Sequence, residues 1–375
     1  GPSAAAARGR GRGRAAVAAG SAAGQASGLR YPGVGGGEDL RRFALDLAAL
    51  FQGGGAWPWS EMEVLVQDAT KLLQAEKTLE RIQVKPGGHI NVVGDVHGQF
   101  FDLFTIWEEN GLPSASNPYI FNGDFVDRGS YSLETLMTLL AWKVACPADV
   151  HLARGNHEAH SMNVPYGFTG EVLTKLGPEA YAEFQTLFDQ LPLAHVVNDH
   201  ALVVHGGLPR DTSVRLADIE ALDRSQGPED ARRIFTDLQW ADPCDKKGQF
   251  RSQRGEDIVV FGPDVTKAFL DANGLGLLIR SHEVKDEGFE WAHDKRCLTV
   301  FSAPQYCDTC DNKGAVIRLN VPEGGGPPET EIRVFTVGPR PDFYVPAMAY
   351  SPMSPTCRKY LSGPAKKLLQ GYLQG

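Results

Sequence analysis

Short apolar runs and amphipathic stretches alternate through the middle of the chain. The apolar runs have the length of buried strands, and the stretches between them repeat apolar residues at helical spacing. Gly111 is expected to end the first of these helices, and Ser132 to cap the start of the second. Such alternation predicts parallel strands joined by crossover helices. The predicted elements are strands at 89–93, 118–121 and 149–153 and helices at 100–109 and 133–144.

Two further helices are predicted ahead of this α/β region. Leu40, Phe43 and Leu47 recur at helical spacing, and the glycines at 53–55 end that helix. The Ser-Glu-Met-Glu sequence at 60–63 has the pattern of a capping box and starts the second helix. We expect both helices to brace the body of the protein.

The pattern changes after about residue 195, where strand-like runs are separated by longer loops. These runs predict a second, more mixed sheet packed on the first, with strands at 201–204, 275–279, 297–301, 315–319 and 332–335. The chain therefore divides into a tail at 1–37, a helical lead-in at 38–88, a catalytic α/β domain at 89–350 and a C-terminal tail at 351–375. In the C-terminal tail, Leu361, Leu368, Leu369 and Tyr372 could form a short amphipathic turn that docks on the body.

Charge separates the N-terminal tail from the rest of the protein. The formal net charge of the 375 residues is −9, yet residues 1–37 hold five arginines and none of the 46 acidic residues. This Ala/Gly/Arg-rich segment has too little apolar surface to fold and predicts a disordered tail, with RNA contact or a transit peptide as alternatives. The acidic body is a poor match for nucleic acid, which is bound mainly through Lys and Arg.

The six cysteines are scattered, and no Asn-x-Ser/Thr glycosylation acceptor occurs, which favours a reducing compartment and hence the cytoplasm or the nucleus. Cys307-x-x-Cys310 lacks a second pair, so we interpret these residues as ordinary free thiols. No apolar run approaches the roughly 18 residues of a membrane span, and we expect no membrane partner.

Polar side chains follow several predicted strands at the point where each strand ends. In an open α/β sheet the carboxyl ends of the strands border the ligand crevice, so these side chains are expected to converge. The donors are oxygen and nitrogen only, which suits manganese, iron or zinc. Six donors are too many for one zinc ion and fit two ions that share a carboxylate. The candidate ligands are Asp95, His97, Asp124, Asn156, His205 and His282.

Two such ions could clamp a phosphoryl group and lower the pKa of a shared water until it is a hydroxide nucleophile. Phosphoryl transfer also needs positive charge beside the phosphate, and Arg128 follows the second motif. His157 is free to act as a general acid, with Asp127 to orient it. A single histidine at a strand end is more often structural, and it is the conjunction of motifs at βαβ spacing that favours catalysis.

The same residues resemble a known family. The motifs look like those of the phosphoprotein phosphatase family of metal-dependent serine/threonine phosphatases, from about Leu79 to Tyr350, and most resemble its type 5 branch. The matching segments are Gly94–Gly98, Gly123–Gly129, Arg154–Glu158, His205–Gly207, Arg280–Glu283 and Ser302–Cys307, and those typical of the branch are Asn117–Ser130, Phe261–Leu270, Arg280–Gly288 and Met348–Tyr350.

The resemblance implies an αββα sandwich with a dimetal centre and phosphoproteins as substrates. One ion would be held by Asp95, His97 and Asp124, and the other by Asp124, Asn156, His205 and His282. Manganese is the expected metal in vitro, and iron with zinc, or manganese, in vivo. The resemblance assigns catalysis to His157, Asp127, Arg128 and Arg254, phosphate binding to Arg128, Asn156, Arg254 and Tyr306, groove positions to Tyr166 and Trp240, and a toxin-reactive thiol to Cys307.

The sequence also departs from the family pattern. Gln305 replaces the usual Asn, and Pro165 precedes Tyr166 where an aliphatic residue is usual. The tetratricopeptide domain of the type 5 branch, which recruits a heat-shock chaperone and inhibits the enzyme, has no counterpart in this sequence. We therefore expect a chaperone partner only if the sequence is a fragment of a longer protein.

Two other functions compete with a protein phosphatase. A phosphodiesterase or dinucleotide hydrolase uses the same donor scaffold, whereas Arg254 and the 302–307 loop resemble the protein phosphatases specifically. A non-catalytic scaffold is the alternative from another class, and the intact set of donors together with His157 argues against it.

Overall fold

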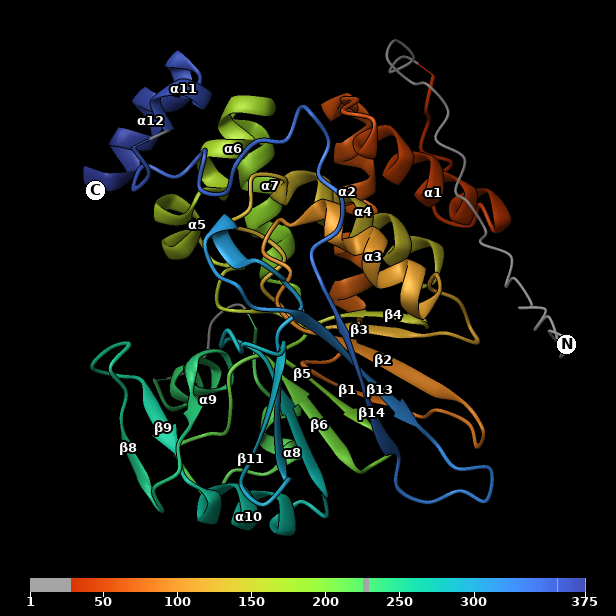
Figure 1. Ribbon diagram of the computed structural model, residues 1–375, viewed down its shortest axis with the longest axis vertical. Coiled ribbons are helices and arrows are strands. Elements are labelled where there is room, and N and C mark those ends of the chain that lie inside the picture. The colour runs from red at the N-terminus through yellow and green to blue at the C-terminus, as the bar shows by residue number, and fades with distance from the viewer. Residues whose placement is uncertain (1–27, 225–228, 356, 375) are drawn as a thin grey trace, which may run out of the picture.

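The computed structural model describes residues 28–224, 229–355 and 357–374, and two large β-sheets form its centre (Figure 1). The first sheet has five strands in the order β14-β13-β2-β3-β4. Its strands β2, β3 and β4 are parallel neighbours, as the alternation of strands and helices predicts, and β13 lies antiparallel to both β2 and β14. The bounds are β2 (His89–Val93), β3 (Tyr119–Phe121), β4 (Val150–Leu152), β13 (Gly314–Asn320) and β14 (Glu329–Phe335).

The second sheet has six strands in the order β1-β5-β6-β10-β12-β11 and is mixed. A small sheet of β7 (Asp242–Pro243), β9 (Val259–Phe261) and β8 (Gln249–Arg251) lies beside it. The six strands are β1 (Leu79–Ile82), β5 (Ala194–Val197), β6 (Ala201–Val204), β10 (Leu277–Arg280), β11 (Phe289–Ala292) and β12 (Cys297–Val300).

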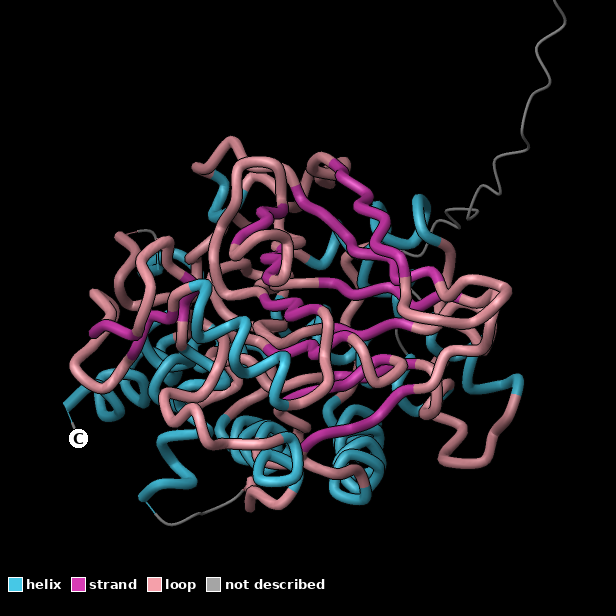
Figure 2. Tube along the Cα trace, turned by 90° about the horizontal axis from the view of Figure 1, so that it is seen from below, coloured by secondary structure: helices cyan, strands magenta, loops and turns pink. Residues whose placement is uncertain are grey.

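Three apolar layers hold the molecule together. Branched side chains of both large sheets, such as Val92 and Ile279, pack face to face in the middle layer. The outer face of the five-stranded sheet packs against helices at 38–52, 59–75, 100–110, 132–145 and 178–188. The outer face of the six-stranded sheet packs against helices at 216–220, 229–240 and 263–272. Seen from below, the strands occupy the middle of the molecule (Figure 2). The predicted αββα sandwich is confirmed.

The helices have the following bounds: α1 (Glu38–Gln52), α2 (Trp59–Ala75), α3 (Phe100–Asn110), α4 (Ser132–Ala145), α5 (His160–Tyr166), α6 (Phe168–Lys175), α7 (Pro178–Phe188), α8 (Leu216–Glu220), α9 (Glu229–Trp240), α10 (Pro263–Ala272), the 3-10 turn η1 (Tyr306–Asp308), α11 (Cys357–Tyr360) and α12 (Gly363–Gln374). Within the described residues, none of them is both long and apolar enough to cross a bilayer.

The predicted capping residues of two helices are wrong. The N-cap of α2 is Pro58, and Ser60 lies inside the helix. In α4, Ser132 is the first helical residue, and the carboxylate of Glu171 accepts the N–H groups of Ser132 and Leu133 at 3.1 and 3.0 Å. A carboxylate at a helix N-terminus satisfies free N–H groups as a cap does. Here the cap comes from another helix, α6, which a local pattern cannot reveal.

The strands predicted at 315–319 and 332–335 exist, but they do not belong to the second sheet. They form β13 and β14, and β13 pairs with the whole length of β2, from Val316 opposite Val93 to Asn320 opposite His89. Antiparallel pairing thus extends the first sheet by a segment more than 200 residues away from β2 in the chain.

Leu29 and Tyr31, within the predicted N-terminal tail, pack against the helices. The Trp57 indole donates to the Leu29 carbonyl at 3.0 Å, and the Tyr31 hydroxyl donates to Asp68 at 3.2 Å. Tyr31 also packs on Phe43, with ring centroids 5.4 Å apart. The prediction of disorder therefore fails for residues 28–37, while residues 1–27 lie outside the described part of the chain.

The C-terminal segment forms α12, a longer element than the predicted turn. Leu361 and Leu369 are buried against Val164 of α5 and Leu173 of α6, whereas Leu368 and Tyr372 are half exposed. The blue helices beside α5 and α6 in Figure 1 show this docking.

Two buried histidines lie between the sheets, away from the strand ends described below. The rings of His151 on β4 and His195 on β5 are 5.6 Å apart, and both ring nitrogens of His195 have no hydrogen-bond partner within the described residues. Burial lowers the pKa of His195 well below its ordinary value, and His151 and the buried Lys143 lower it further. His195 is therefore held neutral in the folded state.

This pair predicts acid-dependent stability. An unfolded imidazole has a pKa near 6.5, so as the pH falls from 7.5 to 5.5 the unfolded state binds a proton that folded His195 does not. The free energy of unfolding should thus fall by about 1.4 kcal/mol through His195 alone. In urea titrations at pH 7.5 and pH 5.5, the unfolding free energy of His195→Gln should fall by about 1.4 kcal/mol less than that of the wild type. An equal fall in both proteins would contradict the prediction.

Candidate metal centre

The five predicted motifs meet where strands of both sheets end. Strands β2, β3 and β4 lead into Asp95, Asp124 and Asn156, while β6 and β10, which are parallel neighbours in the other sheet, lead into His205 and His282. The two sheets are joined at this point by a bridge between Asp95 and Phe301, and the Ser302 N–H donates to the Asp95 carbonyl at 3.0 Å. The local sequence motifs therefore form one buried site.

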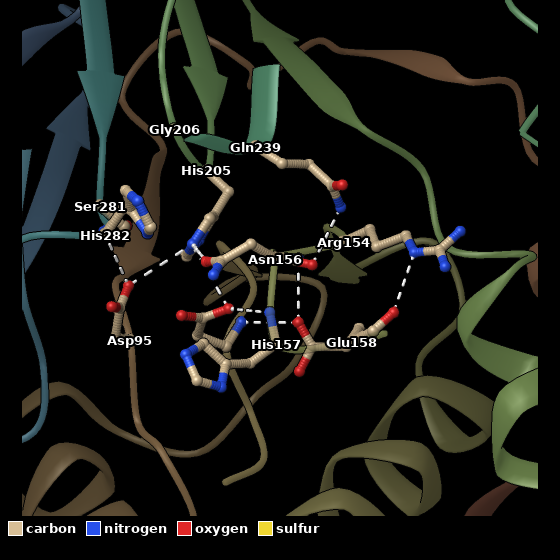
Figure 3. Close-up of polar contacts among 12 residues, drawn as sticks. Asp95, Arg154, Asn156, His157, Glu158, His205, Gly206, Gln239, Ser281 and His282 are labelled. Atoms are coloured by element: carbon tan, nitrogen blue, oxygen red, sulfur yellow. Dashed lines mark hydrogen bonds and ion pairs between the residues drawn. The ribbon is translucent and has the colours of Figure 1, made fainter. Parts of the chain in front are cut away.

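The carboxylate of Asp124 is shared between two imidazoles. Its Oδ2 lies 3.4 Å from His97 Nε2, and its Oδ1 lies 3.4 Å from His205 Nε2. Asp95 Oδ2 lies 3.6 Å from His97 Nε2. Asn156 Oδ1 lies 2.9 Å from His205 Nε2, as Figure 3 shows. Asp124 thus occupies the centre of the donor set, as expected of a bridging ligand.

Backbone carbonyls orient the two imidazoles. His97 Nδ1 lies 2.9 Å from the Val126 carbonyl, and His205 Nδ1 lies 2.8 Å from the Asn122 carbonyl. Hydrogen bonds of this kind fix the tautomer and leave Nε2 as a lone-pair donor, which is the usual arrangement around a metal-binding histidine.

The remaining donors test whether the site fits cations. His282 Nε2 is buried and has no hydrogen-bond partner within the described residues. Two groups of three residues have donor atoms that all lie within 4.8 Å of one another inside the group. One group is His97, Asp124 and His157, and the other is Asp124, His205 and His282. Only oxygen and nitrogen are offered, and Asp124 belongs to both groups. The residues therefore fit two borderline or hard divalent ions.

Electrostatics favour cations at the same position. Burial, together with the nearby carboxylate of Asp124, raises the pKa of Asp95 to about 7. Burial lowers the pKa of His97 to about 3, so this imidazole is neutral and can donate its lone pair. Two carboxylates buried this close together are stable only with compensating positive charge.

Several of these residues have an unusual backbone conformation. The φ angles are 42° at His97, 52° at Asp124 and 71° at His282, and Asp127 and Arg128 follow at 70° and 69°. Left-handed conformations are uncommon for residues other than glycine and are concentrated at functional sites. The surrounding hydrogen bonds must therefore hold the loops in place.

Glu158 supplies such bonds, and sequence reasoning did not assign it a role. Its buried carboxylate accepts the N–H groups of Asp124 at 2.7 Å, Phe125 at 2.8 Å and Gly155 at 2.9 Å. It thereby ties the end of β3 to the end of β4. The only signal in the sequence is that an acidic residue ends the third motif, Arg154–Glu158.

His157 and Asp127 form a hydrogen-bonded pair beside the shared carboxylate. His157 Nδ1 lies 2.8 Å from Asp127 Oδ2, and Asp127 also accepts the Asn163 amide at 3.1 Å and the Phe168 N–H at 2.8 Å. Burial lowers the pKa of His157, but Asp124 and Asp127 outweigh this effect, so its pKa is raised overall. The second ring nitrogen remains available to a substrate.

The two predicted arginines lie in different surroundings. The Arg128 guanidinium lies 3.8 Å above the Tyr166 ring, and its buried Nε has no partner within the described residues. Arg254 Nε lies 2.5 Å from Asp242 Oδ2, and Arg280 contacts the other oxygen of Asp242 at 2.7 Å. Arg254 Nη2 also donates to the His282 carbonyl at 3.3 Å. Both arginines thus border the donor set.

Aromatic rings line the site as expected. The Tyr306 ring lies 5.2 Å from His97, and the Trp240 ring lies 5.5 Å from His282. Burial raises the pKa of the neighbouring Cys307 thiol to about 11. Gln305, the residue that departs from the family pattern, is exposed and has a φ of 49°.

Comparison with known proteins agrees with this geometry. Residues 88–286 match the calcineurin-like phosphoesterase family. The chain belongs to this family. It is 51% identical to serine/threonine-protein phosphatase 5 of Solanum lycopersicum over 76% of this chain and 50% of that protein. It is 47% identical to the human protein of the same name, over 77% of this chain and 56% of that protein.

Among solved structures, a serine/threonine phosphatase from Saccharomyces cerevisiae has a TM-score of 0.76 at 36% identity, over 84% of this chain and 99% of that one. This phosphoesterase chain spans about half the length of the curated relatives it matches. Family membership and the shared Asp124 together indicate a dimetal site.

Glu158 provides a test of how the phosphoesterase loops are held. Both of its oxygens accept N–H groups, so Glu158→Gln must turn an amide N–H₂ group toward at least one donor. We expect the free energy of unfolding to fall by about 1–3 kcal/mol, because a buried N–H donor loses its acceptor. In chemical denaturation, the exposed control Glu108→Gln should change stability by less than about 0.5 kcal/mol. Similar changes in the unfolding free energy of both variants would show that the hydrogen bonds of Glu158 do not stabilise the loops.

Proposed function

We propose that this phosphoesterase is a metal-dependent protein phosphatase that hydrolyses phosphoserine and phosphothreonine. The observation that carries the proposal is the grouping of Arg128 and the His157–Asp127 pair around a carboxylate shared by two donor groups. The relatives named serine/threonine-protein phosphatase 5 support the same activity.

Two divalent ions, when bound, would supply an activated water and positive charge for the phosphoryl group. We propose that Asp95, His97 and Asp124 hold one ion and that Asn156, His205 and His282 hold the other with Asp124. Manganese is proposed in vitro, and iron with zinc, or manganese, in vivo, since imidazole and carboxylate donors suit these metals.

The side chains around the ions bind the phosphate and move one proton. Arg128 and Arg254 bind phosphate oxygens, because planar guanidinium groups match them in geometry and charge. Asn156 and Tyr306 complete the phosphate site. His157 donates a proton from its free ring nitrogen to the leaving seryl or threonyl oxygen, and Asp127 holds the opposite nitrogen so that the ring stays protonated and oriented.

The partners follow from this activity. Phosphoproteins are the proposed substrates, and a chaperone partner is proposed only for a longer form that carries a tetratricopeptide domain. We also propose a cytoplasmic or nuclear location, which the six free cysteines support, because disulfides are rare in those compartments.

The direct test compares substrates. With added manganese the protein should hydrolyse a phosphoserine peptide, and chelation should abolish the activity. A bis-aryl phosphodiester or a dinucleotide should be hydrolysed at least about a hundredfold more slowly, because Arg128 and Arg254 recognise a terminal phosphate dianion. A preference for the diester would instead favour the other branch of phosphoesterases, and inactivity with both substrates would favour a scaffold.

Two variants separate metal binding from phosphate binding. Elemental analysis of Arg254→Ala should still find both manganese ions. Its kcat/KM should fall by a factor that corresponds to about 2–4 kcal/mol of lost transition-state stabilisation, the usual effect of losing one oriented donor. His282→Ala should lose manganese together with turnover. If Arg254→Ala emptied the metal site, its assignment to phosphate binding would be wrong.

A further inference from the structure

The chain returns to the candidate site after β14. Residues 343–349, here called the strap, run past the loop that follows β3 and carries Arg128. The Met348 N–H donates to the Arg128 carbonyl at 2.6 Å. The Ser130 hydroxyl donates to the Pro346 carbonyl at 2.6 Å and lies 3.3 Å from the Ala349 N–H. The strap therefore bonds to the backbone of the Arg128 loop.

Tyr131 adds a second attachment on the same side. Its hydroxyl donates to the Phe343 carbonyl at 3.2 Å and accepts the Val345 N–H at 2.8 Å. Its ring stacks on Tyr344 at 5.7 Å with an angle of 26°. The strap is thus fixed to the loop by both polar and aromatic contacts.

The opposite side of the strap is attached to η1. The Asp308 carboxylate accepts the Tyr344 hydroxyl at 2.9 Å and the Ala347 N–H at 2.7 Å. Asp308 lies two residues after Tyr306, in a turn where Gln305, Cys307 and Asp308 have φ angles of 49°, 55° and 57°. Three unfavourable backbone conformations within four residues need support from outside the turn.

Arg128 and Tyr306 belong to different loops. The strap makes hydrogen bonds to each loop, to Arg128 and Ser130 in one and to Asp308 in the other. We propose that the strap holds these two side chains at a fixed distance across the phosphate site, and that Asp308 and Ser130 are its positioning residues. This inference rests on the proposed function, in which Arg128 and Tyr306 bind the phosphate. Neither positioning residue needs to touch the substrate.

A double-mutant cycle in the full chain tests the inference. Asp308→Ala should raise the KM for a phosphoserine peptide and the Kd of inorganic phosphate about tenfold, with a smaller effect on kcat, because a misplaced binding group weakens substrate and phosphate alike. Tyr344→Phe should have a smaller effect of about threefold. The double variant should equal Asp308→Ala, because the Tyr344 hydroxyl then has no carboxylate to lose.

Asp311→Ala serves as the matched control, since Asp311 is an exposed carboxylate in the same loop. It should stay within about twofold of the wild type in KM and Kd. Additive effects in the double variant, or an Asp308→Ala protein no different from the control, would overturn the inference. Should Asp308→Ala fail to fold, Tyr344→Phe decides: an unchanged phosphate Kd contradicts the strap.

Calorimetric binding of phosphate to the manganese-loaded protein separates this inference from the proposed function. If the wild type binds phosphate but does not hydrolyse the peptide, the proposed function fails, and a tenfold weaker phosphate affinity in Asp308→Ala still supports the strap. If hydrolysis occurs and phosphate binds equally to all variants, the proposed function stands and the strap alone is refuted.

Discussion

The burial of two carboxylates among several imidazoles is the constraint on which the rest of the structure depends. Asp95 and Asp124 are almost completely buried, and burial raises the pKa of Asp95 to about 7. Such a cluster is unfavourable without cations, because desolvation and mutual repulsion act together. Metal ions would supply such positive charge, and one of them would give the unpartnered His282 Nε2 a partner.

The fold meets this constraint with rigid supports around the donor residues. Parallel strands bring Asp95, Asp124 and Asn156 to one edge, and the Asp95–Phe301 bridge joins that edge to the second sheet. Glu158 ties two of the strand ends together through three backbone N–H groups. Residues with a positive φ, such as Asp124, keep this unfavourable conformation because several hydrogen bonds hold the loops around them.

Much of this arrangement could be predicted from the sequence because its signals are local. The spacing of the motifs predicts βαβ units, and residue chemistry at the strand ends predicts six candidate donors and the His157–Asp127 pair. The structure brings these residues together. Contacts between distant segments could not be predicted: the Glu171 cap of α4, the pairing of β13 with β2, and the attachment of the strap to Asp308. Residues 28–37 were misjudged for the same reason, since Tyr31 packs on a helix that composition does not reveal.

The central claim is that Asp124 bridges two metal ions. Crystals grown with manganese, with anomalous diffraction recorded on both sides of the manganese absorption edge, test it most directly. The account predicts two anomalous peaks about 3.5–4 Å apart, each within bonding distance of one Asp124 oxygen. A single peak, or two peaks of which only one contacts Asp124, would contradict it.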